Sequence, residues 1–233
     1  MRSGNSIKRL LKDVADIMKA PLVQNGIYYV HDEENMYKGT AMIIGPKDTP
    51  YENGYYFFKF QFPKAYPFRP PKLTYCTNDG TTRFNPNLYE CGKVCVSILN
   101  TWKGEQWTSC QTIRSSLLTL TMLLNNNPLT NEPGFNPTHR SCIPYKRMIQ
   151  YMNYKTAILG MLTKSNLPGR FQSYYPILVK HFIENKQDIL NQLKNLEESN
   201  INGMEDWIGI YSMRCKYKYT ELRKLFLCIS EKL

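Results

Sequence analysis

Residues 55–71 read YYFFKFQFPKAYPFRPP, and this stretch decides the fold class. Toward its middle, aromatic and polar residues alternate, so that Phe58, Phe60 and Phe62 share one face and the polar residues between them share the other. Such alternation is typical of a half-buried strand. Four prolines then follow within nine residues. Because proline has no backbone N–H to donate to a ladder, these prolines predict a rigid loop after the strand.

The sequence on both sides predicts the rest of a small sheet. Residues 26–30 and 37–44 precede the aromatic strand, and residues 72–76 follow the proline-rich loop. Upstream, apolar residues from Ile7 to Met18 recur at helical spacing with charged residues between them, and Pro21 ends the pattern. A helix followed by an antiparallel meander of about four strands is an α+β pattern.

Beyond the sheet the sequence predicts one long loop and then helices. Residues 77–111 show little periodicity, and an irregular segment of that length inside a domain is usually functional. Residues 112–124 are apolar almost all round, which predicts a central buried helix. In the last third, three helices are expected over residues 145–162, 174–196 and 220–233.

Composition limits the function classes. The chain has 233 residues, 42% of them hydrophobic and 21% charged, which excludes a disordered chain. Lysine and arginine exceed aspartate and glutamate by 30 to 19, a net charge of +11 that favours acidic partners. The three histidines do not pair at ligand spacing and no C-x-x-C occurs, so no metal is expected. Nucleotide-binding glycine motifs do not occur either, and no cofactor is expected.

Seven cysteines, an odd number, indicate a reducing compartment with mostly free thiols. The first residues carry no long apolar run of the kind a signal peptide needs, and no stretch approaches the roughly 18 apolar residues of a membrane span. We therefore expect no membrane association. The expected location is the cytoplasm, with the nucleus as an alternative, or the host cytoplasm if a virus encodes the chain.

The centre of the long loop, residues 83–99, reads RFNPNLYECGKVCVSIL and contains Cys95 between two valines. For an arbitrary cysteine in such a setting, a buried structural role is the default interpretation, since free cysteine is among the most buried residue types. Asn85 and Asn87 could likewise be simple turn formers around Pro86. Considered separately, these residues do not decide between structure and chemistry.

Taken together, the motifs resemble those of the ubiquitin-conjugating enzymes. That family carries a His-Pro-Asn tripeptide with the catalytic cysteine eight residues after the asparagine, and here Asn85-Pro86-Asn87 precedes Cys95 at that spacing. The family's Tyr-Pro-Phe-x-Pro-Pro loop stands at residues 66–71, and its downstream tryptophan is matched by Trp107. Its Gly-Pro-x-x-Thr-Pro-Tyr-x-x-Gly turn stands at residues 45–54.

Four further motifs resemble those of one branch of this family. Enzymes of that branch carry both ubiquitin and the modifier FAT10, and they have a helical C-terminal extension. These motifs are RFNPN, GKVC, TW-x-G-x-x-W and NEPGF, the last at residues 131–135. The resemblance implies the α+β ubiquitin-conjugating-enzyme fold. It also implies a catalytic core over residues 1–150 and a helical extension over residues 151–233.

The resemblance assigns roles to four residues. Cys95 would be the nucleophile that carries the modifier as a thioester, and Asn87 would stabilise an oxyanion or support the loop that shapes the site. Glu132 replaces the family's aspartate near the acceptor lysine and would help to activate that lysine. Asn85 replaces the usual histidine, as in the same branch, and that position is thought to be structural.

The expected partners are an activating enzyme, ubiquitin or a ubiquitin-like modifier, a ligase and protein substrates, with no nucleic acid. In the family the first helix and two loops dock these proteins. Transferred to this chain, the docking residues are Lys8, Arg9, Lys12, Phe68, Trp107, Thr108 and Ser109. Two alternatives stay open: a non-catalytic adaptor of the same fold, and a basic nucleic-acid module, although no binding motif supports the latter.

Overall fold

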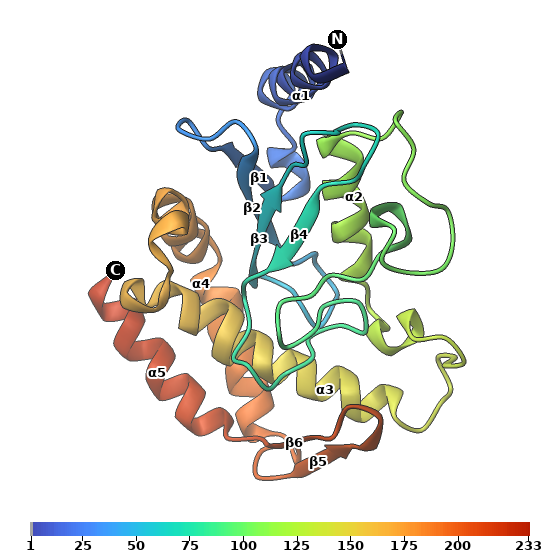
Figure 1. Cartoon of the computed structure of the whole chain (residues 1–233). Coiled ribbons are helices and arrows are strands. Elements are labelled where there is room, and N and C mark those ends of the chain that lie inside the picture. The colour runs from blue at the N-terminus through green and yellow to red at the C-terminus, as the bar shows by residue number, and fades with distance from the viewer. Residues whose placement is uncertain (1) are drawn as a thin grey trace.

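The computed structural model describes residues 2–233, with side chains described from Ser6 onward. Figure 1 shows α1 at one end of a four-stranded sheet, and at the opposite end α3, α5 and a small hairpin. The elements are, in chain order, α1 (Arg2–Lys19), β1 (Ile27–His31), β2 (Lys38–Ile44), β3 (Tyr55–Gln61), β4 (Lys72–Tyr75), α2 (Ile113–Leu123), α3 (Cys142–Met152), α4 (Tyr175–Glu198), β5 (Glu205–Ile208), β6 (Met213–Lys216) and α5 (Tyr219–Lys232).

The sheet is the predicted antiparallel meander, with strand order β1-β2-β3-β4. Its register places Phe58 opposite Ala41 on one neighbour and opposite Tyr75 on the other. Residues directly opposite each other in a sheet point to the same face. Phe58 and Phe60 of β3 therefore lie on one buried face, as the alternation predicts, and the α+β fold class is confirmed.

The other face of β3 is covered by the C-terminal extension. Tyr55 and Phe57 lie on the same face as Lys59, yet both are at most 1% exposed. The ring centroid of Phe57 is 4.7 Å from that of Phe171, and the Tyr55 hydroxyl donates to the carbonyl of Leu178 at 3.1 Å. The extension thus buries an aromatic row that the sheet would otherwise present to water.

Two of the three C-terminal helices form where the sequence predicts them, and one differs. The helix expected over residues 145–162 begins earlier, at Cys142, and changes from α- to π-helical geometry over Asn153–Gly160. Asn153, the first residue of the π-helical segment, links this segment to other parts of the fold. Its buried side chain accepts a hydrogen bond from Tyr56 at 2.6 Å and donates to the carbonyl of Glu52 at 2.8 Å. The altered helix thus carries a polar link to the sheet.

The sequence did not predict the hairpin β5–β6, whose strands are four residues long. Four residues show little alternation, and these two strands, unlike the equally short β4, do not follow a proline-rich loop within a predicted meander. Ile208 pairs with Met213, and the connecting turn ends at Ser212 with a positive φ of 52°. The hairpin carries Tyr211 toward the central loop, as described below.

Helix α2 is the predicted central helix, but it is not buried all round. Its first turn is capped by Thr112, whose hydroxyl accepts from the backbone N–H of Ser115 at 3.1 Å. Leu117 and Leu120 are at most 1% exposed, whereas Met122 is 77% exposed. The expectation of complete burial was therefore wrong, because α2 lies against the sheet on one face only (Figure 1).

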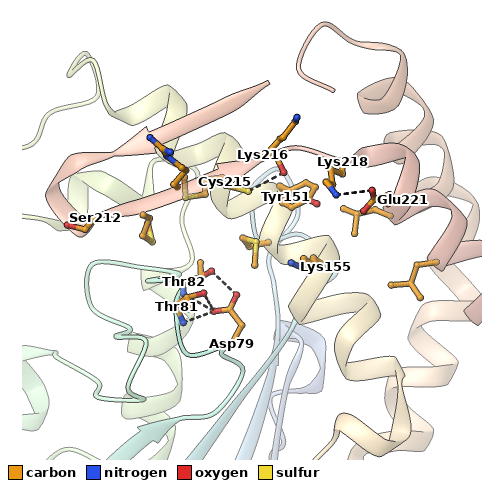
Figure 2. A pocket seen from close by; sticks show the side chains of 16 residues that line it. Asp79, Thr81, Thr82, Tyr151, Lys155, Ser212, Cys215, Lys216, Lys218 and Glu221 are labelled. Carbon is orange, nitrogen blue, oxygen red and sulfur yellow. Dashed lines mark hydrogen bonds and ion pairs between the residues drawn. The ribbon is translucent and has the colours of Figure 1, made fainter. Parts of the chain in front are cut away.

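Helix α3 and its π-helical continuation run across residue 150 without a break, and one hydrophobic core includes residues on both sides. The division into a core of residues 1–150 and an extension of residues 151–233 stays a prediction. A cavity of about 700 Å³ remains where the loop at Asp79 faces β6 and α5, and Figure 2 shows lysines and Cys215 around it. In residues 2–233, no helix combines the length and apolar character needed to cross a membrane.

Candidate active site

Cys95 and Asn87 are joined by two hydrogen bonds. The backbone N–H of Cys95 donates to the carbonyl of Asn87 at 2.9 Å, and the side-chain amide of Asn87 donates to the carbonyl of Cys95 at 2.6 Å. Cys95 is 1% exposed and Asn87 5% exposed. The structure thus brings together the two residues that the sequence singles out, eight positions apart, and fixes the amide beside the cysteine.

Asn85 is hydrogen-bonded to the loop that carries this pair. Its side-chain amide donates to the Tyr51 hydroxyl at 2.9 Å and to the carbonyl of Leu123 at 2.8 Å. Its oxygen accepts from the backbone N–H of Asn87 at 3.0 Å. Asn85 is fully buried, and buried polar groups of this kind stabilise a loop only when they are paired. These contacts fit the structural role that the resemblance implies for this position.

Asn131 connects the same network to the loop of Glu132. The Asn131 amide lies 3.3 Å from the side-chain oxygen of Asn85 and 3.1 Å from the carbonyl of Leu123. Asn131 is the residue before Glu132. Glu132 is therefore held one residue from a hydrogen-bond chain that leads through Asn85 to Asn87.

The carboxylate of Glu132 has a partner that the sequence did not predict. The Tyr211 hydroxyl, from the turn between β5 and β6, donates to Glu132 Oε2 at 2.7 Å. The two residues are 79 positions apart, and no motif connects them. Arg83 and Asn131 were missed as well, although both lie within motifs that the sequence analysis quotes.

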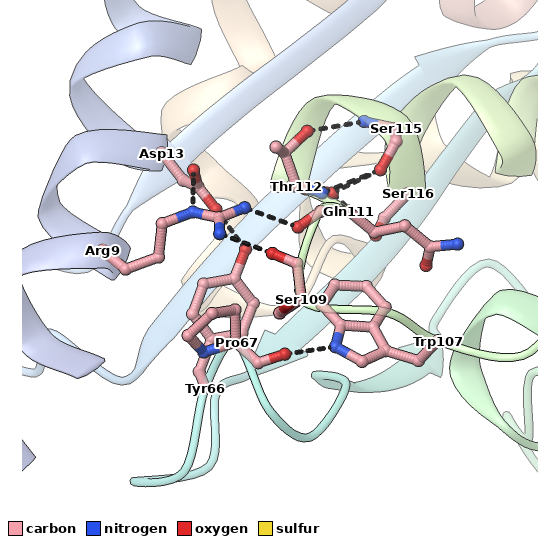
Figure 3. Close-up of polar contacts among 10 residues, drawn as sticks. All are labelled: Arg9, Asp13, Tyr66, Pro67, Trp107, Ser109, Gln111, Thr112, Ser115 and Ser116. Atoms are coloured by element: carbon pink, nitrogen blue, oxygen red, sulfur yellow. Dashed lines mark hydrogen bonds and ion pairs between the residues drawn. The ribbon is translucent and has the colours of Figure 1, made fainter. Parts of the chain in front are cut away.

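At the α1 end, Arg9 joins the first helix to the loop that follows Trp107. Its guanidinium donates to Asp13 at 2.9 Å, to the carbonyl of Ser109 at 2.5 Å and to the carbonyl of Gln111 at 2.8 Å (Figure 3). Asp13 is 4% exposed and also accepts from the Tyr66 hydroxyl. Arg9 therefore has internal partners in this structure.

Trp107 holds the proline-rich loop. Its indole N–H donates to the carbonyl of Pro67 at 2.5 Å, and its ring centroid is 5.8 Å from that of Tyr66 (Figure 3). The side chain is 8% exposed, so little of the ring is available to another protein. Phe68, next in the same loop, is 69% exposed.

The other predicted docking residues lie at the same end and are exposed: Lys8, Lys12, Thr108 and Ser109. The docking surface stays a prediction. On it, the side chains of Phe68, Lys8 and Lys12 are exposed to a partner protein. Arg9 and Trp107 instead hold the elements that carry them. In the part of the chain from residue 2 onward, no cluster of three or more metal-ligating side chains occurs.

Comparisons with known proteins show the family to which the chain belongs. A family model described as ubiquitin-conjugating enzyme matches residues 9–150. Ubiquitin-conjugating enzyme E2 Z of Xenopus tropicalis is 38% identical over 186 residues, which cover 78% of this chain and 58% of that protein. The same-named protein of Homo sapiens is 40% identical over 157 residues, covering 66% of this chain and 44% of that protein. The chain therefore belongs to the ubiquitin-conjugating enzyme family.

A more distant relative is the probable ubiquitin-conjugating enzyme protein 17 of Caenorhabditis elegans. It is 36% identical over 198 residues, which cover 79% of this chain and 26% of that protein. The expected family, fold and branch are thus confirmed. The chain spans between a quarter and three fifths of the length of these relatives.

Proposed function

We propose that this protein accepts ubiquitin, or a ubiquitin-like modifier, as a thioester on Cys95 and transfers it to a substrate lysine. In the first step the Cys95 thiolate attacks the thioester carried by an activating enzyme, and the thiolate of that enzyme leaves. In the second step the lysine amine attacks the new thioester, an isopeptide bond forms, the Cys95 thiolate leaves and the amine loses a proton.

The observation that carries this proposal is the pairing of Asn87 with Cys95. A side-chain amide has two N–H groups, and the contact to the Cys95 carbonyl uses one of them. The second has no protein acceptor among the described residues, and we propose that it donates to the thioester carbonyl as negative charge develops there during lysine attack. A single fixed donor of this kind is worth about 3 kcal/mol in the transition state, or roughly a hundredfold in rate.

Glu132 is proposed to receive the acceptor lysine. Its loop is connected to Asn85 through the neighbouring Asn131, so the backbone of Glu132 is linked to the Asn87–Cys95 pair. A carboxylate near the attacking amine can orient it and accept the proton it releases. The exposed residues at the α1 end, Lys8, Lys12 and Phe68, are proposed to dock the activating enzyme and ligases.

One experiment tests the first step. The protein is incubated with activating enzyme, ATP and ubiquitin, and the products are separated on a non-reducing gel, with parallel reactions that contain other modifiers. A thiol-sensitive adduct that disappears in Cys95→Ala supports the proposal. If no modifier forms an adduct although the protein is folded, a non-catalytic adaptor role replaces it.

A second experiment tests the role of Asn87. Asn87→Ala should slow discharge to free lysine by about a hundredfold while charging by the activating enzyme changes much less, because thioester exchange is nearly balanced in energy. Single-turnover discharge of the preformed thioester measures the first quantity, and the charging rate measures the second. Equal loss in both steps would contradict an oxyanion role.

A further inference from the structure

The hairpin β5–β6 places Tyr211 against the acceptor side of the proposed site. Its hydroxyl donates to Glu132 Oε2 at 2.7 Å. In the described part of the chain Glu132 Oε1 accepts no hydrogen bond from a protein group. One oxygen of the carboxylate is thus held by the extension, and the other remains available to an incoming amine.

Tyr211 is itself fixed by several contacts. Its ring lies 4.5 Å from the guanidinium carbon of Arg83, and its centroid is 5.6 Å from that of Tyr145. The Tyr145 hydroxyl donates to the carbonyl of Arg83 at 2.7 Å, and the backbone N–H of Arg83 donates to the sulfur of Met213 at 3.1 Å. These contacts join the hairpin to the start of the central loop, so each segment restricts the movement of the other.

The Tyr211 hydroxyl keeps its proton and so remains a hydrogen-bond donor. Burial is the main cause that raises the pKa of Tyr211 far above its ordinary value, and the adjacent carboxylate raises it further while Arg83 acts in the opposite direction. Tyr211 therefore stays protonated near neutral pH. A protonated hydroxyl can donate to a carboxylate but cannot itself remove a proton from the lysine.

We propose that Tyr211 is a positioning residue for isopeptide formation, which holds the Glu132 carboxylate by Oε2 so that Oε1 receives the acceptor lysine. This inference rests on the proposed function of the site. A free glutamate side chain has three torsions to order before it can meet the amine, and an existing hydrogen bond removes most of that freedom in advance. The extension would thereby contribute to a reaction whose other residues all lie before residue 150.

The test compares two hydroxyl deletions. Tyr211→Phe keeps the ring and its contacts with Arg83 and Tyr145 but removes the donor to Glu132. Tyr217→Phe is the matched control, because the Tyr217 hydroxyl donates to a carboxylate of the same hairpin, Asp206, at 2.6 Å. Both variants lose one hydroxyl–carboxylate hydrogen bond, but only one loses it beside the proposed site.

The measurement is single-turnover discharge of the Cys95 thioester to free lysine over a range of lysine concentrations. Tyr211→Phe should lower the limiting rate about tenfold, the size expected for loss of one hydrogen bond to a charged group, with a smaller change in the half-saturating concentration. Charging should be unchanged, and Tyr217→Phe should discharge at the rate of the unaltered protein. In a Glu132→Gln background, Tyr211→Phe should have little further effect.

Discharge by Tyr211→Phe at an unaltered or higher rate would overturn the proposal, and so would an equal tenfold loss in the Glu132→Gln background. Normal discharge by Glu132→Gln would overturn it too, because Tyr211 would then position nothing. Failure of the proposed function is a different result: no thioester forms on Cys95 in the unaltered protein.

Discussion

The two ends of the molecule hold their loops in different ways. At the α1 end, Arg9 and Trp107 hold the loops through backbone carbonyls, those of Ser109, Gln111 and Pro67, while the bond from Arg9 to the Asp13 carboxylate stays within α1. At the other end, Tyr211 donates to a side chain, the carboxylate of Glu132. A bond to a carbonyl fixes where a loop runs and leaves its side chains free for other proteins. The bond to Glu132 sets the position of a carboxylate in the proposed site, so it acts on chemistry more than on shape.

We expect the greatest change in stability when the buried Trp107 is replaced, and almost none when the exposed Trp207 is replaced. Trp107→Ala should lower the free energy of unfolding by about 3–5 kcal/mol, because it leaves a cavity and removes the donor to Pro67. Trp207→Ala, on β5, removes a side chain that is 57% exposed and should change stability by less than about 0.5 kcal/mol. Urea unfolding measures both. Similar losses would show that the hairpin is as much a part of the core as the α1 end.

Within α1, Arg9 is expected to contribute to stability and Lys12 to docking of the activating enzyme. Arg9→Ala should lower the free energy of unfolding by about 1–3 kcal/mol, since it leaves the buried Asp13 carboxylate with Tyr66 alone. Lys12→Ala is the control at an exposed position of the same helix and should leave stability unchanged while slowing charging by the activating enzyme. If Lys12→Ala charges normally, the docking role of this lysine fails.

A smaller effect concerns pH. His181 of α4 lies 3.2 Å from the Tyr55 hydroxyl, and burial lowers its pKa, with Glu184 acting weakly in the opposite direction. The unfolded chain then binds a proton more readily than the folded one. Stability should fall as pH falls below about 6.5 toward the lower folded pKa.

Burial also lowers the pKa of His31, on β1, so part of this loss should remain when His181 is replaced. Unfolding at pH 7.5 and 5.5 measures it, and His181→Gln should show a smaller drop than the unaltered protein. An identical drop in the variant would assign the acid sensitivity to other groups.

The smallest effect is one of thiol reactivity. Burial raises the pKa of Cys215, on β6, to about 11, and the thiolate is the reactive form. Iodoacetamide at pH 8 should therefore label the exposed Cys91, Cys110 and Cys228 well before Cys215, as followed by mass spectrometry of peptides. Labelling of Cys215 as fast as Cys228 would show that the hairpin leaves the body of the protein readily.

The sequence predicted the sheet and most helices because those signals are local. The alternation of β3 and the spacing in α1 are set by neighbours a few residues apart. The π-helical segment after Met152 and the two strands β5 and β6 were not predicted. Both segments make hydrogen bonds with residues that are distant along the chain, Tyr56 and Arg83.

The fold class, the family and the spacing between Asn87 and Cys95 could be read from the sequence alone, because those signals are short and fixed along the chain. Only the tertiary structure decided that the extension covers one face of β3 and that Tyr211 meets Glu132. A hydrogen bond between residues 79 positions apart leaves no periodicity or motif. It arises when the core has brought both segments to the same place.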